Sequence, residues 1–152
     1  MLRGRMLLAL IFFLIALPVI VVVVQVDDFG RDLTANWAET SWAADDSLLR
    51  PISVVQPMED VVAAIKSAAD ALARWELVGE QADTASTILE YVYTSRLFRF
   101  KDDIAVRVED QETSRLITAT SRSRVGKGDL GQNPRNLRAL LGAVRERLGV
   151  HR

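Results

Sequence analysis

Residues 104–124 read IAVRVEDQETSRLITATSRSR, and this stretch decides the fold. Ile104, Val106 and Val108 alternate with Arg107 and Glu109, which is the period-two pattern of a strand with one apolar face. Polar residues 110–114 predict a turn, and residues 115–124 alternate again. Because strands joined by a short turn pair antiparallel, the stretch predicts a β-hairpin.

Further elements extend the hairpin in both directions. Upstream we expect a short strand at 50–55, a helix opened by Pro57 and ending near Arg74, a strand from Trp75 to Val78 with a turn at Gly79, and a long strand over 88–100. Both faces of the long strand mix polar and apolar residues, which favours a bulge near Ser95. Residues 101–103 are expected to separate this strand from the next one. Downstream, Asn133 is expected to cap a last helix, with Pro134 in its first position and Gly149 at its end.

These elements run in the order strand, helix, four strands, helix. Short turns favour antiparallel pairing, and two amphipathic helices can cover one face of such a sheet. We therefore predict an α+β domain with an antiparallel sheet of about four to five strands and two helices on one face. It would occupy residues 50–152.

An apolar segment precedes this domain. Residues 6–26 carry no charge, and at 1.5 Å per residue a helix of this length spans about 30 Å, the thickness of the hydrocarbon core. It is longer than the apolar region of a signal peptide and has no small-residue pair at its exit, so residues 1–26 are predicted to be an uncleaved transmembrane anchor. Arg3 and Arg5 precede it and acids follow, which predicts a cytoplasmic N-terminus in the inner membrane and a periplasmic domain. Residues 27–49 are interpreted as a tether.

Composition narrows the chemistry. The chain has no cysteine, which excludes disulfides, thiolate metal sites and a cysteine nucleophile, and its one histidine is His151 at the C-terminus. Residues 27–94 carry a net charge of −9 and residues 95–152 carry +6, so the near-zero total hides two opposite halves. These charges either neutralise one another in the fold or leave a basic surface.

The densest polar group in the sequence is a glycine-punctuated loop that runs into the last helix. Glycines at 126, 128 and 131 allow backbone amides to turn toward a ligand, and a helix N-terminus favours anions. The spacing is not that of a phosphate-binding P-loop. We identify as candidate anion- or partner-binding residues Arg122, Arg124, Lys127, Asn133 and Arg135; the alternative is that the arginines form structural ion pairs with Asp102, Asp103 or Asp129.

Two adjacent carboxylates, Asp102 and Asp103, are the second candidate group. They could share a proton or bind a hard cation, although neighbours in a strand point to opposite faces and a turn would favour a loop-capping role. No catalytic residue, resident metal or cofactor is assigned. Net charge and location argue against nucleic acid as a partner.

Two segments resemble the bacterial DUF1499 family, a domain of unknown function. They are Thr94–Asp103 (TSRLFRFKDD) and Ser121–Asn133 (SRSRVGKGDLGQN), and the resemblance covers roughly residues 45–149. It implies no activity. Many members carry an upstream cysteine segment whose counterpart here, near residues 38–46, has no cysteine. The positions that match the family motif are Asp102, Asp103, Ser123, Arg124, Gly126, Asp129, Gly131 and Asn133.

The leading interpretation is a non-enzymatic, membrane-anchored extracytoplasmic domain. It would bind an anionic envelope ligand or a protein partner through the basic loop of Arg122, Arg124 and Lys127. One alternative is a metal-assisted hydrolase, which needs Asp102, Asp103 and Asp129 within about 4–6 Å of one another. A third hypothesis is that the motif is a tightly bridged structural turn and that function lies on another surface.

Overall fold

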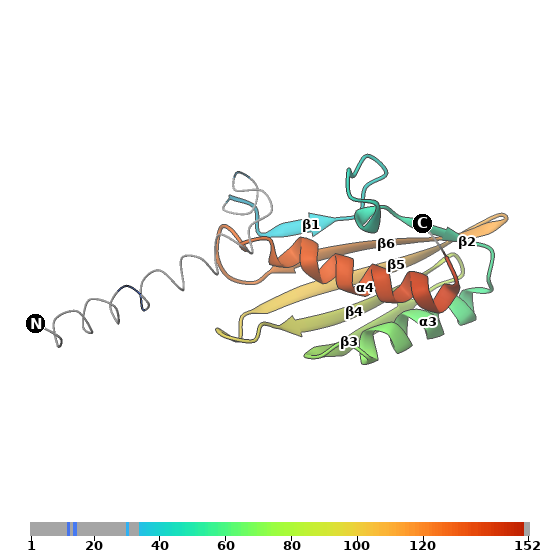
Figure 1. The fold of residues 1–152 in the computed structure, drawn as a ribbon. Helices are drawn as coiled ribbons and strands as arrows, with labels where there is room; N and C mark the ends of the chain where they lie inside the picture. The colour runs from blue at the N-terminus through green and yellow to red at the C-terminus, as the bar shows by residue number, and fades with distance from the viewer. Residues whose placement is uncertain (1–11, 13, 15–29, 31–33, 151–152) are drawn as a thin grey trace, which may run out of the picture.

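The computed structural model describes Phe12, Leu14, Gly30 and residues 34–150 (Figure 1). Residues 34–150 form two layers, a six-stranded sheet and two helices that lie on one of its faces. The elements run in the order β1 (Trp37–Glu39), the 3-10 helix η1 (Ser47–Leu49), β2 (Ile52–Val54), α3 (Met58–Asp70), β3 (Trp75–Ala82), β4 (Ser86–Thr94), β5 (Lys101–Gln111), β6 (Ser114–Ser123) and α4 (Gln132–Leu148). This confirms the predicted α+β class and, from residue 50 onward, the predicted order of elements.

The sheet is antiparallel and is built around the predicted hairpin. β5 and β6 pair along their length, from Asp102 opposite Ser123 to Gln111 opposite Ser114. β4 and then β3 continue the sheet beyond β5, while β1 and β2 both pair with β6 on its other side. The short strands β1 and β2 therefore share one edge of the sheet.

The core lies between the sheet and the helices. Ile104, Val106 and Val108 point from β5 into this layer and are at most 1% exposed, as the sequence alternation predicts. Leu137, Leu140, Leu141 and Val144 of α4, with Val61 and Ile65 of α3, cover them and have no exposed area. On the opposite face of the sheet, Arg107 and Arg122 are exposed to solvent.

The predicted long strand over 88–100 is wrong at its end. β4 stops at Thr94, and residues 95–100 form the connection, closed by hydrogen bonds from the Ser95 amide to the Phe100 carbonyl (2.8 Å) and from the Phe100 amide to the Ser95 hydroxyl (2.8 Å). Residues 101–103, which were predicted to interrupt the strand, are instead the first three residues of β5. Pairing with β4 and β6 supplies hydrogen-bond partners for the backbone groups of these polar residues. The local amino-acid composition carries no information about such pairing with distant strands.

Three smaller boundaries also differ from the prediction. α3 ends at Asp70, and Arg74 at φ 68° lies in the left-handed region, which a helix cannot continue through. α4 begins at Gln132, so Asn133 lies inside the helix and is not its cap. The predicted tether contributes β1 and η1 to the domain. Gly149 ends α4 in the left-handed conformation, as predicted.

The predicted anchor lies outside the described residues, apart from Phe12 and Leu14. Within the part of the chain that the structure describes, no helix has both the length and the apolarity that a membrane span requires.

We predict that Leu141→Ala lowers the free energy of unfolding by about 2–5 kcal/mol, because it opens a cavity between α4 and the sheet. Urea unfolding in maltoside micelles, followed by tryptophan fluorescence, measures the loss. Val55→Ala is the matched control, since Val55 is 82% exposed and its truncation should change stability by no more than about 0.5 kcal/mol. Equal effects of the two variants would contradict the packing of α4 against the sheet.

Candidate functional site

The inner face of the sheet changes from apolar to polar at one end. There Asp102 of β5 is 2% exposed and lies beneath the N-terminal half of α4. Its Oδ1 accepts a hydrogen bond from the Ser123 hydroxyl (2.7 Å), and its Oδ2 accepts one from Nδ2 of Asn136 (2.9 Å). Burial raises the pKa of the Asp102 carboxyl, and the bonds from Ser123 and Asn136 act in the opposite direction.

Asn133 joins this polar layer to three other segments. It has no exposed area, and its Oδ1 accepts a bond from the Ser121 hydroxyl (2.6 Å). Its Nδ2 donates to the Ser123 hydroxyl (3.0 Å), to the backbone carbonyl of Asn36 (2.8 Å) and to the Asp129 carboxylate. A buried amide with this many partners is structural, and it fixes α4, β6 and the entering chain together.

The Asp129 carboxylate occupies the N-terminus of α4. Its Oδ1 accepts from the Gly131 amide (2.8 Å) and its Oδ2 from the Asn133 amide (2.8 Å), which satisfies groups that a helix start otherwise leaves without partners. Gly131 has φ 75°, a conformation that suits glycine. The amides predicted to face an anion are therefore bonded to the chain's own carboxylate.

Asp103 and Arg124 lie on the other face of the sheet. The Arg124 guanidinium donates to both oxygens of Asp103, with Nε at 3.0 Å from each and Nη2 at 2.6 Å from Oδ1. These bonds raise the pKa of Arg124. The side chains are 47% and 54% exposed, so solvent screens the pair. This is one of the ion pairs foreseen as the structural alternative.

The three carboxylates considered for metal-assisted hydrolysis do not converge. Asp102 points into the core, Asp103 points to the opposite face, and Asp129 is bonded to helix amides. Among the described residues there is no cluster of three acidic or histidine side chains that could hold a metal ion. The arrangement that the hydrolase hypothesis needs is absent from this part of the chain.

The five candidate binding residues separate into different environments. Asn133 is buried in the polar layer, and Arg124 pairs with Asp103. Arg135 is half-buried and its Nη2 lies 3.4 Å from Oε1 of Gln132. Arg122 and Lys127 are exposed. Arg122 and Lys127 are thus solvent-facing cations, Arg124 is an exposed cation paired with Asp103, and Asn133 is held in internal contacts.

A hollow of about 290 Å³ lies at the same end of the sheet and was not predicted. It is lined by Arg74, Trp75, Glu76, Thr94, Ser95, Arg96 and Arg99. Two of these arginines, Arg74 (φ 68°) and Arg99 (φ 55°), hold left-handed backbone conformations, which non-glycine residues rarely adopt outside functional sites and tight turns. The sequence signal was available, because Arg96 and Arg99 lie within the first family segment.

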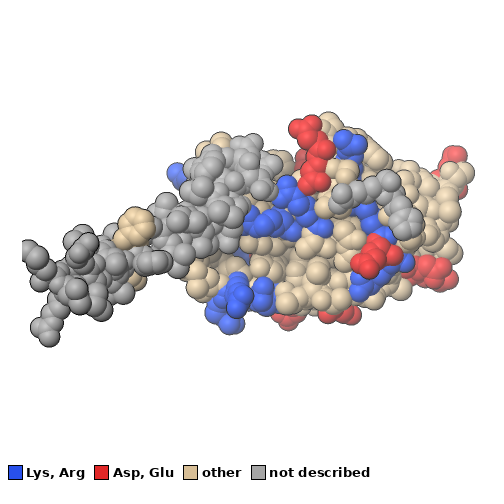
Figure 2. Space-filling model, in the orientation of Figure 1, with Lys and Arg blue, Asp and Glu red and all other residues tan. Residues whose placement is uncertain are grey.

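The hollow and the basic loop belong to one surface, which we call the basic end. It comprises residues 94–101, residues 122–128 and Arg74. The Arg124 amide donates to the Lys101 carbonyl (3.0 Å), so the two connections lie side by side. Figure 2 shows basic side chains at this end and across the middle of the visible face, and acidic side chains at the top, along the lower edge and at the far end. The opposite charges of the two halves of the sequence are thus partly segregated on this face.

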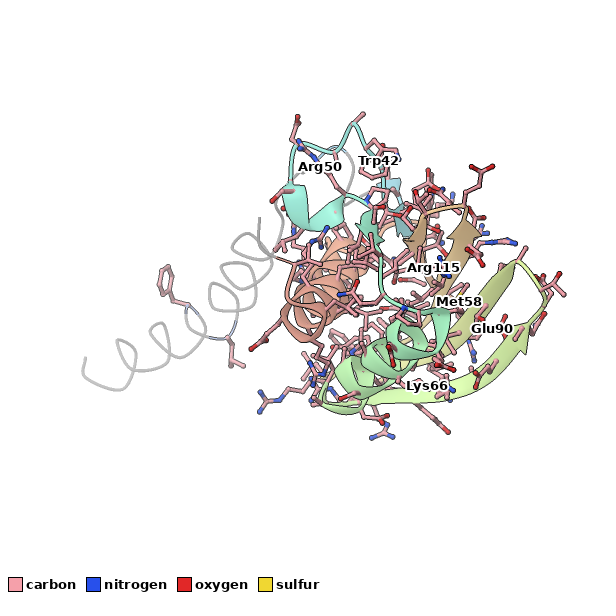
Figure 3. All side chains as sticks on the ribbon, turned by 90° about the vertical axis from the view of Figure 1, so that its right-hand side faces the viewer. Trp42, Arg50, Met58, Lys66, Glu90 and Arg115 are labelled. Carbon is pink, nitrogen blue, oxygen red and sulfur yellow. The ribbon has the colours of Figure 1, made fainter. Side chains whose placement is uncertain are left out.

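A second hollow, of about 510 Å³, lies between α3 and the outer strands. Figure 3 shows α3, with Met58 and Lys66, inside the curve of β3 and β4. Lys66 forms an ion pair with Glu80 (2.6 Å) across it. Burial, followed by the charges of Asp70 and Glu80, raises the pKa of Tyr91 to about 12, so this phenol stays protonated at neutral pH. A phenol that stays protonated cannot serve as a general base near neutral pH.

A family model described as "Protein of unknown function (DUF1499)" matches residues 26–144. The match starts earlier than the range of 45–149 expected from the motif, and it includes β1 and every motif position. No curated protein matches the chain significantly. Among solved structures, the Zhui aromatase/cyclase from Streptomyces sp. R1128 is similar at 14% identity over 75% of this chain and 86% of that chain, with a TM-score of 0.23.

We predict that the contribution of Asp102 to the free energy of unfolding increases toward acid pH. Because the pKa of Asp102 is higher in the folded state than in the unfolded chain, protonation favours the folded state. The stability of wild type relative to Asp102→Asn should therefore rise as the pH falls through the folded pKa toward about 4, the unfolded value. It should fall as the pH rises. Urea unfolding in micelles across pH 3.5–7.5 measures this difference.

Asp103→Asn is the matched control, since it removes a carboxylate of the same strand from the exposed face. A relative stability of wild type that grows with rising pH would contradict the assignment of Asp102 as a carboxyl disfavoured by burial.

Proposed function

The chain belongs to the DUF1499 family, and we propose that it is a non-enzymatic, membrane-anchored domain in the periplasm that binds an anionic envelope ligand at its basic end. The proposal keeps the predicted location and ligand class. It moves the binding surface from the basic loop alone to the basic end as a whole. It also adopts the interpretation of the motif as a structural turn.

The anchor is supported by the sequence. Residues 6–26 are uncharged and long enough to span the hydrocarbon core. Arg3 and Arg5 precede this segment, and Asp27, Asp28 and Asp32 follow it. Since basic flanks stay in the cytoplasm, this arrangement supports a cytoplasmic N-terminus and a domain on the other side of the inner membrane.

The observation that carries the binding proposal is the arginine-lined hollow. Arg74, Arg96 and Arg99 surround it, and Glu76 is the one acidic residue in its lining. Arginine's planar fork binds carboxylate and phosphate groups with two hydrogen bonds at once. Arg122 and Lys127 add exposed positive charge on the neighbouring strand end and loop. The hollow is therefore suited to a phosphate or carboxylate group of a larger envelope molecule.

The motif residues support this surface without needing to touch a ligand. Asp102, Asn133 and Asp129 hold the ends of β5, β6 and α4 in place through buried and partly buried hydrogen bonds. The hydrolase alternative lacks its converging carboxylates, and a protein partner remains the alternative occupant of the basic end. Charge favours an acidic partner in that case.

We predict that Val55→Cys reacts with a membrane-impermeant maleimide in cells whose outer membrane has been made permeable. The chain has no native cysteine, and Val55 is 82% exposed, so any labelling reports this position alone. A cysteine placed before the apolar segment, Leu2→Cys, should react only after the inner membrane is lysed. The opposite pattern, or release of the protein from membranes by alkaline carbonate, would contradict the proposed anchor and its orientation.

We predict that Arg96→Ala with Arg99→Ala weakens binding of inorganic pyrophosphate by at least about tenfold, because each charge-assisted hydrogen bond lost costs about 1.5–3 kcal/mol. Isothermal titration calorimetry of the full chain in maltoside micelles, at constant ionic strength, measures the affinity. Arg107→Ala is the matched control, because Arg107 is exposed on the sheet face and pairs with Glu109 (3.0 Å). Equal affinity of all three proteins would exclude the hollow as the anion site.

A further inference from the structure

The tip of the basic end carries apolar side chains that are exposed to solvent. Leu97 is 79% exposed, Phe98 69%, Phe100 51% and Val125 63%. The rings of Phe98 and Phe100 are stacked, with centroids 5.5 Å apart and planes at 23°. Single exposed apolar residues are common, whereas a group of four on two adjacent connections marks an interaction surface.

Basic residues alternate with these apolar ones. Arg96, Arg99 and Lys101 interrupt the first connection, and Arg124 and Lys127 flank Val125 in the second. Apolar side chains that project beside cations suit the boundary of an anionic bilayer, where the rings and aliphatic groups enter the headgroup layer and the cations meet phosphates. An acidic peptide would pair with the cations but would leave the apolar side chains of the tip exposed to water.

The entering chain holds this tip close to the proposed anchor. The backbone carbonyl of Asn36 accepts a hydrogen bond from the Ser123 amide (2.8 Å), and the side-chain Nδ2 of Asn36 donates one to the Gly126 carbonyl (3.0 Å). These two bonds fix residue 36 at the basic end. Nine residues lie between Val26 and Asn36, which makes ten residue-to-residue steps. Even fully extended they reach about 35 Å, so the basic end cannot move far from the point where the apolar segment leaves the membrane.

The tip is also shaped before any ligand arrives. Two hydrogen bonds between Ser95 and Phe100 close the first connection, and the Arg124 amide ties the second connection to Lys101. Gly126, at φ 95°, turns the chain immediately after Val125. A preorganised surface loses little conformational entropy on docking.

We propose that the basic end docks on the periplasmic, anionic leaflet of the bilayer that the anchor spans, with Leu97, Phe98, Phe100 and Val125 in the headgroup layer and Arg96, Arg99 and Lys127 against lipid phosphates. This inference rests on the proposed function and identifies its ligand as a phospholipid surface. The anchor supplies the high local concentration, and docking then fixes the orientation of the sheet relative to the membrane.

The test uses the absence of native cysteine. Phe98→Cys is labelled with the fluorophore NBD, and the full chain is inserted into nanodiscs of phosphatidylcholine alone or with 30% phosphatidylglycerol. The control is Val55→Cys, whose side chain is similarly exposed but follows β2 at the opposite end of the sheet. Quenching by doxyl-labelled lipids reports whether each label reaches the headgroup layer.

We expect quenching of the label at residue 98 to be at least threefold stronger than at residue 55, and to be stronger with phosphatidylglycerol than without it. Arg96→Ala with Arg99→Ala should remove the dependence on lipid charge. No quenching at residue 98 in either lipid would overturn the docking surface, and equal quenching in both would overturn its anionic specificity.

Two further outcomes separate this inference from its premises. If residue 98 stays in water while pyrophosphate binding still depends on Arg96 and Arg99, docking is overturned and the proposed function stands. If replacing Asp27, Asp28 and Asp32 by Asn shifts the label's emission while lipid charge does not, the tip binds the acidic segment of its own chain, which also overturns docking. Failure of the protein to enter nanodiscs would overturn the anchor itself.

Discussion

The burial of one carboxylate constrains the whole basic end of this domain. Asp102 is placed on the inner face of β5 by the same alternation that buries Ile104, Val106 and Val108. A carboxyl group taken out of water must find hydrogen-bond partners or destabilise the fold. Ser123 and Asn136 donate to it, which fixes the register of β6 against β5 and the position of α4 over both. Asn133 then carries the same network to the chain that enters at Asn36.

This requirement explains why polar residues dominate a segment that resembles a binding loop. Asp129 caps α4, Gly131 allows the turn before it, and Asn133 fills the space between three segments. Each has an internal partner whose loss would leave a buried polar group unsatisfied. The cations Arg122 and Lys127 have no such requirement, and neither do Arg96 and Arg99. The motif therefore combines residues that build the end of the sheet with residues that this construction presents to solvent.

The sequence predicted the elements that depend on local pattern. The alternation in 104–124 gave the central hairpin, and the helical stripe with its terminal Gly149 gave α4. Prediction from the sequence failed where a residue's environment depends on partners that are distant along the chain. Residues 101–103 resemble a turn locally, but strand pairing and Asn136 make them part of β5. The hollow was missed because Arg74 and Arg96 lie 22 positions apart and meet only through the pairing of β3 with β4.

The polar layer also explains why the apolar tip faces outward. Phe98 and Phe100 lie beyond Asp102 and Asn133 along the sheet, so a polar layer separates them from the hydrophobic core. Moving either ring inward would break hydrogen bonds that the buried carboxylate needs, and each buried polar group left without a partner costs about 1–3 kcal/mol. The exposed rings are thus a stable consequence of how this end is built. Removing their apolar area from water requires a surface outside the domain, and the bilayer is the one to which the chain is proposed to be tethered.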